Sequence, residues 1–398
     1  MTESRSDILI SGGGVAGLTA AAAFGAAGFT VTITDPSPPV TDAGADGADL
    51  RTTALLQPAR DVLDRAGLWS RLAGDAAPLQ VMQIVELAGA EPRSHAFDAA
   101  EMSEAPFGWN LPNWLLRREM VAHLGTLDTV DFRPGVATRQ VVARTDEIRA
   151  VLSDGARVTA KLAIAADGRD SALRAAAGIG RQRTTYGQKA LAFVVTHPIP
   201  HDNVSTEIHR AGGPFTLVPL PDLDGVPRSA VVWMERGPEA VRLASLPEED
   251  FNAEMSERSG YHLGPLTLIG RRSIWPIISQ VADRFTGRRL ALIAEAAHVV
   301  PPIGAQGLNM SIADIAALLK SAEARPGALG GPEMLAAYQR ARYADVAARV
   351  AGVDLLNRAS MAGAPMLQAA RGWATRALAE ITPARRLAMA LGLGQSPG

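Results

Sequence analysis

The stretch Asp7–Asp35, DILISGGGVAGLTAAAAFGAAGFTVTITD, decides the fold of this chain. Its apolar start, Asp7–Ser11, has the composition of a buried parallel strand. The alanine-rich residues Leu18–Ala27 favour a helix, which Gly28 ends. The β-branched run Phe29–Thr34 predicts a second strand. This order predicts a strand–helix–strand unit with parallel strands, the opening of an α/β fold.

The turn between the first strand and the helix fits the pattern G-x-G-x-x-G. Gly12 permits a tight turn, Gly14 lets the backbone approach a pyrophosphate, and Gly17 lets helix and strand pack closely. The helix N-terminus offers free N–H groups and a partial positive charge to phosphates. An acid at the end of the second strand can accept hydrogen bonds from an adenosine ribose. The pattern therefore predicts a dinucleotide site made of Gly12, Gly14, Val15, Ala16, Gly17 and Asp35.

Length and composition narrow the class of protein. The 398 residues suffice for two lobes, and 47% hydrophobic with 20% charged residues is ordinary for a globular protein. A formal net charge of −2, without a run of basic residues, argues against nucleic acid as a partner. The chain has no cysteine, which excludes disulfides, thiolate metal sites and a cysteine nucleophile and fits the reducing cytoplasm. Prolines between His197 and His201 prevent a shared helical face, so we expect no metal site.

One uncharged stretch, residues 8–34, is long enough on paper to span a bilayer. Its interior carries the glycine turn, Thr19 and a run of alanines, and no basic region precedes it. We therefore interpret this stretch as strand, turn, helix and strand, and expect a soluble, cytoplasmic chain.

The rest of the sequence predicts a second domain inserted into the first. Residues 54–66 favour a helix, and residues 161–166 form another buried-strand candidate. Between residues 184 and 270, alternating apolar segments separated by proline and glycine turns predict an antiparallel sheet. The predicted division is 1–78, 101–183 and 271–330 for the first domain, 79–100 and 184–270 for the sheet domain, and 331–398 for a helical C-terminal segment.

Two later segments carry more specific patterns. Ala165–Ser171, which reads AADGRDS and is followed by Arg174, resembles the Asp-Gly fingerprint of flavoprotein hydroxylases. Ala294–His298, followed by Pro301–Asn309, is similar to their Gly-Asp segment. With the glycine turn, the chain resembles the single-component flavoprotein aromatic monooxygenases of the para-hydroxybenzoate hydroxylase type. The resemblance is closest to the ubiquinone-biosynthesis hydroxylases.

Further matches spread this resemblance over nearly the whole chain. They are Arg51–Leu55, Arg117, the triplet Tyr186-Gly187-Gln188 and the segment Asp354–Arg358. The family implies a Rossmann-like FAD-binding domain, an inserted antiparallel β-sheet substrate domain and a helical C-terminal segment. It also implies FAD as the cofactor and NAD(P)H as the electron donor. The absence of a second G-x-G-x-x-G agrees with a nicotinamide that binds only transiently.

The resemblance implies roles for particular residues. The glycine turn and Asp35 would hold the ADP half of FAD, and guanidinium groups of Arg51 and Arg117 would lie against its pyrophosphate and ribityl parts. Asp167 would serve both FAD and nicotinamide access. A helix N-terminus beside the flavin pyrimidine edge would stabilise the negative charge of reduced flavin. The residues implied at that edge and at the ribityl chain are Glu295, Gly304, Gln306, Gly307, Leu308 and Asn309.

The sequence departs from the family pattern at three places. The usual Gly-Asp is Ala294-Glu295, so the carboxylate near the ribityl chain has an extra methylene. Asp35 replaces the usual glutamate, and Ser311–Asp314 lacks a basic residue that is common after the glycine turn.

The family implies hydroxylation of a phenolic substrate with O₂ through a C4a-hydroperoxyflavin. The substrates that it implies include polyprenylated ubiquinone precursors. The cofactor performs the hard chemistry, so we name no catalytic acid or base from the sequence. Pro302 is the expected substrate contact, since the matching backbone carbonyl in the family faces the phenol hydroxyl. His298 is either a second substrate contact or an architectural residue.

Two rival functions stay open from sequence alone. One is a flavin dehydrogenase or reductase without oxygenation, and the other is a non-catalytic accessory protein that binds flavin or quinone. The resemblance also leaves open a homo-oligomer, a quinone-biosynthesis complex, and peripheral contact with the inner face of the membrane through the apolar and arginine-containing stretch 365–393.

Overall fold

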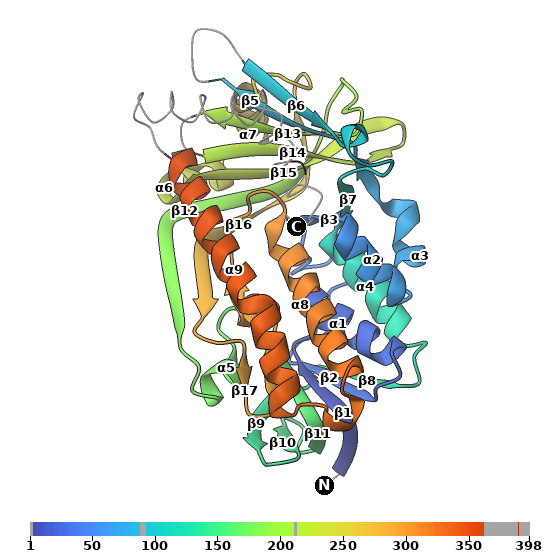
Figure 1. The fold of residues 1–398 in the computed structure, drawn as a ribbon. Helices are drawn as coiled ribbons and strands as arrows, with labels where there is room; N and C mark the ends of the chain where they lie inside the picture. The colour runs from blue at the N-terminus through green and yellow to red at the C-terminus, as the bar shows by residue number, and fades with distance from the viewer. Residues whose placement is uncertain (1–2, 88–92, 211–212, 362–388, 390–398) are drawn as a thin grey trace.

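The fold is taken from a computed structural model, which describes residues 3–87, 93–210, 213–361 and 389. The glycine turn and its flanking strands lie in the first of two large sheets, and helices cover that sheet (Figure 1). The second sheet lies above it in this view, and a long C-terminal helix runs along both.

The first sheet has the order β17-β18-β11-β1-β2-β8, with the β9–β10 hairpin attached to β11. β1 is parallel to β2, as the opening sequence predicted. β1 is also parallel to β11, and β2 is parallel to β8. The strands of this sheet are β1 (Glu3–Ser11), β2 (Val31–Asp35), β8 (Val130–Pro134), β9 (Thr138–Ala143), β10 (Ile148–Leu152), β11 (Arg157–Ala165), β17 (Thr286–Gly287) and β18 (Leu290–Leu292).

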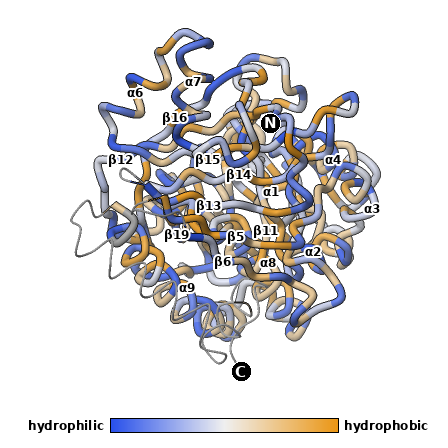
Figure 2. Tube along the Cα trace, turned by 90° about the horizontal axis from the view of Figure 1, so that it is seen from above, coloured by the Kyte–Doolittle hydropathy of each residue, from blue (hydrophilic) through white to orange (hydrophobic). Residues whose placement is uncertain are grey.

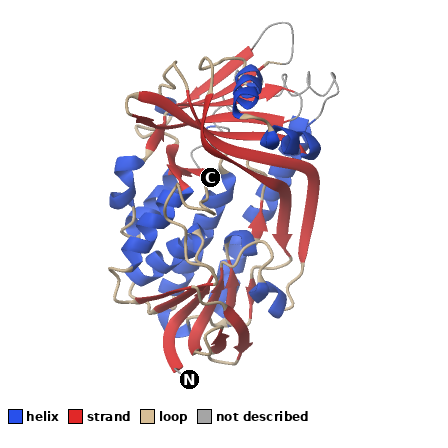
Figure 3. Cartoon of the chain, turned by 180° about the vertical axis from the view of Figure 1, so that it is seen from behind, coloured by secondary structure: helices blue, strands red, loops and turns tan. Residues whose placement is uncertain are grey.

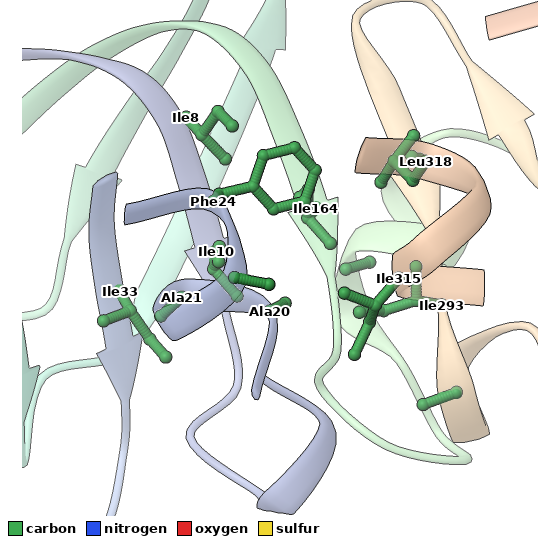
Figure 4. Close-up of a cluster of buried hydrophobic side chains, with 14 of the residues drawn as sticks. Ile8, Ile10, Ala20, Ala21, Phe24, Ile33, Ile164, Ile293, Ile315 and Leu318 are labelled. Atoms are coloured by element: carbon green, nitrogen blue, oxygen red, sulfur yellow. The ribbon is translucent and has the colours of Figure 1, made fainter. Parts of the chain in front are cut away.

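Helices on the first sheet shield its apolar strands from water. In Figure 4, Ile10 of β1, Phe24 of α1 and Ile164 of β11 belong to one buried cluster, which Ile315 of α8 joins. Burial of each large aliphatic or aromatic side chain contributes about 1.5–3 kcal/mol. The α-helices within the described residues are α1 (Val15–Ala26), α2 (Gln57–Arg65), α3 (Trp69–Leu72), α4 (Asn113–Leu124), α5 (Ala172–Ala176), α6 (Gly237–Ser245), α7 (Glu248–Arg258), α8 (Gln306–Glu323) and α9 (Pro332–Met361).

The second sheet has the order β19-β16-β12-β15-β14-β13-β5-β6. Its neighbours are antiparallel except for the parallel pair β13 and β5. Viewed from behind, β12 and β16 bend down toward the first sheet and so connect the two layers (Figure 3). Its strands are β5 (Val81–Glu86), β6 (Arg93–Asp98), β12 (Arg181–Thr196), β13 (Val204–Arg210), β14 (Gly213–Leu223), β15 (Val226–Arg236), β16 (Thr267–Ala282) and β19 (His298–Val299).

A small third sheet, β3-β7-β4, stands between these layers beside α2 and α4. Its strands are β3 (Thr52–Leu56), β4 (Ala77–Leu79) and β7 (Gly108–Pro112). The prediction of a helix from residue 54 was therefore wrong in its first turn, because residues 54–56 pair with β7 and the helix begins at Gln57.

The mixed α/β class with an inserted sheet and a C-terminal helix is confirmed. The six-part domain division stays a prediction, and two long strands cross its boundaries. β12 begins at Arg181, before residue 184, and β16 continues to Ala282, past residue 270. The predicted boundaries lie where the pattern of apolar residues and turns in the sequence changes. The two strands run unbroken across these boundaries, from one layer into the other.

Hydropathy along the chain follows this layering. Seen from above, hydrophobic segments gather around β11 and α8, and α7 is mainly hydrophilic (Figure 2). Among the described residues, no helix is both long and apolar enough to span a membrane. The stretch 365–393, for which membrane contact was left open, lies outside the described residues except for Met389. Met389 is buried against Phe97 and Phe107.

Candidate functional site

The glycine turn links β1 to α1 at the carboxyl edge of the first sheet. Gly12 has a φ of +113°, and a Cβ atom there would collide with the carbonyl of Ala166, which follows β11. A Cβ on Gly17 would collide with the carbonyl of Gly12. In contrast, nothing lies within 4 Å of a Cβ built on Gly14, the residue before α1. Chain packing therefore requires Gly12 and Gly17, whereas Gly14 faces open space at a helix N-terminus, where a phosphate group binds favourably.

Asp35 ends β2 directly beside this turn. One carboxylate oxygen accepts a hydrogen bond from the backbone N–H of Gly13 at 2.6 Å, and the other accepts one from Ser37 at 2.8 Å. Val15 is buried and Ala16 half-buried in the first turn of α1. Asp35 thus holds the glycine turn in place, and its bond to a ribose remains a prediction.

The Asp-Gly and Gly-Asp segments, far apart in sequence, meet next to the glycine turn. Glu295 accepts hydrogen bonds from Nε and Nη2 of Arg169 at 3.1 and 3.3 Å. Arg174 is buried and donates one bond to each segment, to the carbonyls of Ala296 at 2.8 Å and Arg169 at 3.0 Å. Asp167 accepts one bond, from the backbone N–H of Leu173, through Oδ2. Its Oδ1 is buried without a hydrogen-bond partner.

A second polar cluster forms around Asp49, which the sequence did not single out. Arg51 donates two hydrogen bonds of 2.7 Å to Asp49, and Arg117 approaches the same carboxylate at 3.5 Å. Burial alone would raise the pKa of Asp49, but the hydrogen bonds and charges of these arginines lower it. The guanidinium of Arg51 also lies 5.3 Å from the ring centre of Trp275 in β16. Nε of Arg117 is buried without a partner.

The turn before α8 brings a helix N-terminus toward these clusters. Gly304 and Ala305 both have positive φ, 62° and 54°, and direct the chain into α8 at Gln306. Gly307 is exposed, and nothing lies within 4 Å of a Cβ built on it. Leu308, half-buried, follows in the same turn of the helix. Backbone N–H groups of this first turn have no partner within the helix and are free for a ligand.

Two polar side chains of this turn bind protein atoms. Asn309 accepts a hydrogen bond from the N–H of Leu56 at 2.9 Å and donates one to the carbonyl of Ala54 at 2.7 Å. Gln306 bonds to the carbonyl of Gly304 and to Arg349 of α9. Any contact of Asn309 or Gln306 with a cofactor would therefore come mainly from the backbone.

His298 is buried and forms a hydrogen bond with Asp314. In the sequence, Asp314 stood out only as the end of Ser311–Asp314, a segment that departs from the family pattern. Nε2 of His298 is 2.7 Å from Oδ2 of Asp314, which is fully buried in α8. Asp314 also accepts hydrogen bonds from the N–H of Ala294 at 3.1 Å and from Nε of Arg342 at 2.8 Å. Burial would raise the pKa of Asp314, but His298 and Arg342 lower it. This placement supports the architectural reading of His298; a charged residue within an apolar helix was the sequence signal for the cluster.

The surroundings of Pro302, the predicted substrate contact, are apolar. Pro302 is exposed, and the adjacent Ile303 packs against the lower face of the second sheet. The apolar cluster there consists of Ala190, Met234 and Ile277, with Tyr186, Val232, Trp275 and Ile303 packed against it. A flat, uncharged ring would suit this environment.

The residues present fit an FAD. Asp167 Oδ1 is an unpaired acceptor and Arg117 Nε an unpaired donor, and both are buried. Open space adjoins Gly14, at the start of α1, and Gly307, in the first turn of α8. The positive end of α1 favours the anionic pyrophosphate, and that of α8 favours the anionic reduced flavin.

Comparison with known proteins supports this fit. A family described as FAD binding domain matches residues 5–352. The ubiquinone hydroxylase UbiL of Rhodospirillum rubrum is 34% identical over 393 residues, covering 98% of this chain and 89% of that protein. The 3-demethoxyubiquinol 3-hydroxylase of Escherichia coli is 26% identical, covering 99% and 100% of the two chains.

A solved structure shares the fold. The p-nitrophenol 4-monooxygenase PnpA of Pseudomonas putida superimposes with a TM-score of 0.79 at 20% identity and covers both chains completely. The predicted resemblance and the FAD cofactor are confirmed, NAD(P)H is the typical electron donor, and neither rival function is favoured. The chain belongs to the FAD-binding domain family and is an FAD-dependent monooxygenase.

Proposed function

We propose that this monooxygenase hydroxylates the aromatic ring of a phenolic, polyprenylated quinone precursor. The observation that carries the proposal is the 34% identity to a ubiquinone hydroxylase over 98% of the chain. The apolar side chains of Ile303 and Trp275, both half-buried, support it, because they suit a neutral ring better than a charged one.

The reaction consumes the substrate, NAD(P)H, H⁺ and O₂, and yields the hydroxylated ring, NAD(P)⁺ and water. Bound FAD would supply the redox chemistry, by taking a hydride from NAD(P)H and activating O₂. The protein's part is to bind and orient. In our proposal Gly12–Gly17 and Asp35 hold the ADP half, and Arg51, Arg117, Asp167 and Glu295 hold the pyrophosphate and ribityl parts.

The first turn of α8, residues 306–309, would direct its N–H groups at the pyrimidine edge. In residues 301–305, the turn before α8 that we call the flavin turn, the carbonyl of Pro302 would accept a hydrogen bond from the phenol hydroxyl. The sheet above would exclude water from the ring, which favours oxygen transfer over release of peroxide.

The test is label incorporation by the purified, FAD-loaded protein. We expect NAD(P)H oxidation to accelerate with prenylated phenols under ¹⁸O₂, and one labelled oxygen to enter the product. Poor substrates should yield peroxide instead. Oxidation of NAD(P)H without label in any product, across simple and prenylated phenols, would contradict the proposal.

A prenylated substrate resides in a bilayer, so we further propose that the protein contacts the inner face of the membrane peripherally. Sedimentation with vesicles that contain a prenylated phenol tests this. Equal recovery in the supernatant with and without vesicles would contradict it.

A further inference from the structure

Two motifs noted in the sequence, Tyr186-Gly187-Gln188 and Asp354–Arg358, have no part in the FAD site proposed above. The structure brings them together at the upper end of α9, beside β12 (Figure 1). The pairing of β12 with β16 passes from Thr185 opposite Ile278 to Lys189 opposite Pro276. Residues 186–188 therefore bulge out of the ladder, and a bulge redirects the side chains it carries.

The bulge and the helix are joined by polar contacts. The hydroxyl of Tyr186 donates a hydrogen bond to Asp354, and Asn357 donates one of 2.9 Å to Gln188. Arg358 pairs with Asp354 at 2.9 Å and lies 5.9 Å from the centre of the Tyr186 ring. We call these five residues the clasp.

The hydroxyl of Tyr186 serves as a donor. Burial and its bond to Asp354 raise the pKa of Tyr186 to about 12, so the phenol keeps its proton at neutral pH. Hydrogen bonds from Arg358 and Tyr186 lower the pKa of Asp354, so its carboxylate stays charged. A neutral donor on a charged acceptor makes a strong, directional bond.

The other end of Tyr186 belongs to the substrate side of the site. Its ring packs against the apolar cluster that also receives Ile303, next to Pro302, and Trp275, on which Arg51 lies. One residue thus contacts α9 through its hydroxyl and, through its ring, the apolar cluster against which Ile303 also packs.

We propose that Tyr186 is a positioning residue for the aromatic substrate. Its ring forms one wall of the ring-binding surface beside Ile303, and Asp354 fixes the orientation of that wall from α9. The proposal rests on the proposed function, because it concerns the same ring. Misplacement of a substrate by even 1 Å strongly slows its reaction. Loss of the anchor should therefore weaken ring binding and divert reducing equivalents to peroxide.

The experiment compares Tyr186→Phe, Asp354→Asn and the double variant, each loaded with FAD. Leu355→Ala is the matched control, because Leu355 neighbours Asp354 on α9 but is 68% exposed. The dissociation constant of a phenolic ligand is measured from the flavin absorption change in the oxidised protein, and peroxide is measured per NAD(P)H consumed. We expect both single variants to raise the constant about 2- to 10-fold, the value of one hydrogen bond, and to raise the peroxide fraction.

FAD affinity should not change. Tyr186→Phe removes the bond and Asp354→Asn weakens it by removing the charge, so the double variant should bind the ligand no more weakly than the more strongly affected single variant. Ligand binding and peroxide fractions equal to wild type would overturn the proposal, even with a lower melting temperature, because the clasp would then be structural only. If the wild type binds phenols but incorporates no ¹⁸O, the proposed function is wrong. The dissociation constants of the variants then still show whether the clasp positions the ring. If the wild type binds none of the simple and prenylated phenols, the proposal of a ring-binding surface is wrong, and so is the proposed role of Tyr186.

Discussion

Asp314 is the residue on which the segments behind the flavin turn converge. It accepts hydrogen bonds from Ala294, His298 and Arg342, and so connects the Gly-Asp segment, β19 and α9 through one buried carboxylate. Ala294 has a φ of +55°, a conformation that needs such support in a residue other than glycine. By fixing Ala294, Asp314 also fixes the adjacent Glu295.

Asp314→Asn should therefore be strongly destabilising. It removes the fully buried negative charge that faces Nε of Arg342 and that accepts a hydrogen bond from His298, which costs about 3–5 kcal/mol. Asp345→Asn is the control, because Asp345 also pairs with Arg342 but its side chain is 35% exposed, and its loss should cost about 1 kcal/mol or less. Urea unfolding measures the free energy of unfolding of each variant. Equal losses in the two variants would show that the buried cluster stabilises the fold no more than the partly exposed ion pair does.

The same variant should change the response to acid. Because the folded-state pKa of Asp314 is lowered, its charge stabilises the fold above the unfolded-state pKa near 3.8, and this stability is lost as the pH falls through the folded value. Below about pH 4, wild type should lose stability more steeply than Asp314→Asn. Parallel curves of unfolding free energy against pH would refute this.

Among the elements, α8 packs against α1 and α9 and directs its N-terminus at the proposed flavin site. The glycine turn, its helix and the start of α8 could be predicted from sequence, because each depends on local backbone chemistry. A Cβ on Gly12 or Gly17 would collide with backbone atoms, and Gly304 has a positive φ, which glycine favours. The prediction of secondary structure was wrong where pairing with a distant part of the chain determines the structure. β3 reads locally as helix, but its residues pair with β7, more than 50 residues later. The roles of Asp49 and Asp314 were likewise missed, because their partners come from other elements.

Gly307→Asp tests the direction of α8. A carboxylate at this position would meet the negative charge of reduced flavin and lower the flavin reduction potential, by an effect on the order of 1 kcal/mol, or about 20 mV for a two-electron couple. Reduction by NAD(P)H should slow, while FAD stays bound through the distant ADP site. Gly307→Asn is the matched control, since it adds the same bulk without charge. Redox titration and anaerobic stopped-flow reduction give the answer; identical potentials in the two variants would mean that the turn does not face the flavin.

At the scale of the whole molecule, the proposed FAD site joins parts of the chain from Gly12 to Asn309. Both helix N-termini, the arginine cluster at Asp49 and the paired Asp-Gly and Gly-Asp segments surround it. A ligand that binds only the folded state stabilises it by about 2.7 kcal/mol at one hundred times its dissociation constant. FAD should therefore raise the melting temperature. FMN, which lacks the ADP half and so cannot use the glycine turn, should raise it much less.

Gly14→Ala separates this coupling from the stability of the fold itself. Gly14 has a φ of −69°, which alanine adopts freely, and a Cβ there meets nothing within 4 Å, so the variant without FAD should melt within a few degrees of wild type. The added methyl occupies the space proposed for the pyrophosphate and should weaken FAD binding at least about tenfold, equivalent to about 1.4 kcal/mol. Thermal melts with and without FAD measure both effects. Gly327→Ala, another position where a Cβ meets nothing, should keep the full FAD-dependent increase. An increase retained in Gly14→Ala would mean that the pyrophosphate does not bind at the start of α1, and the assignment of the glycine turn would have to be abandoned.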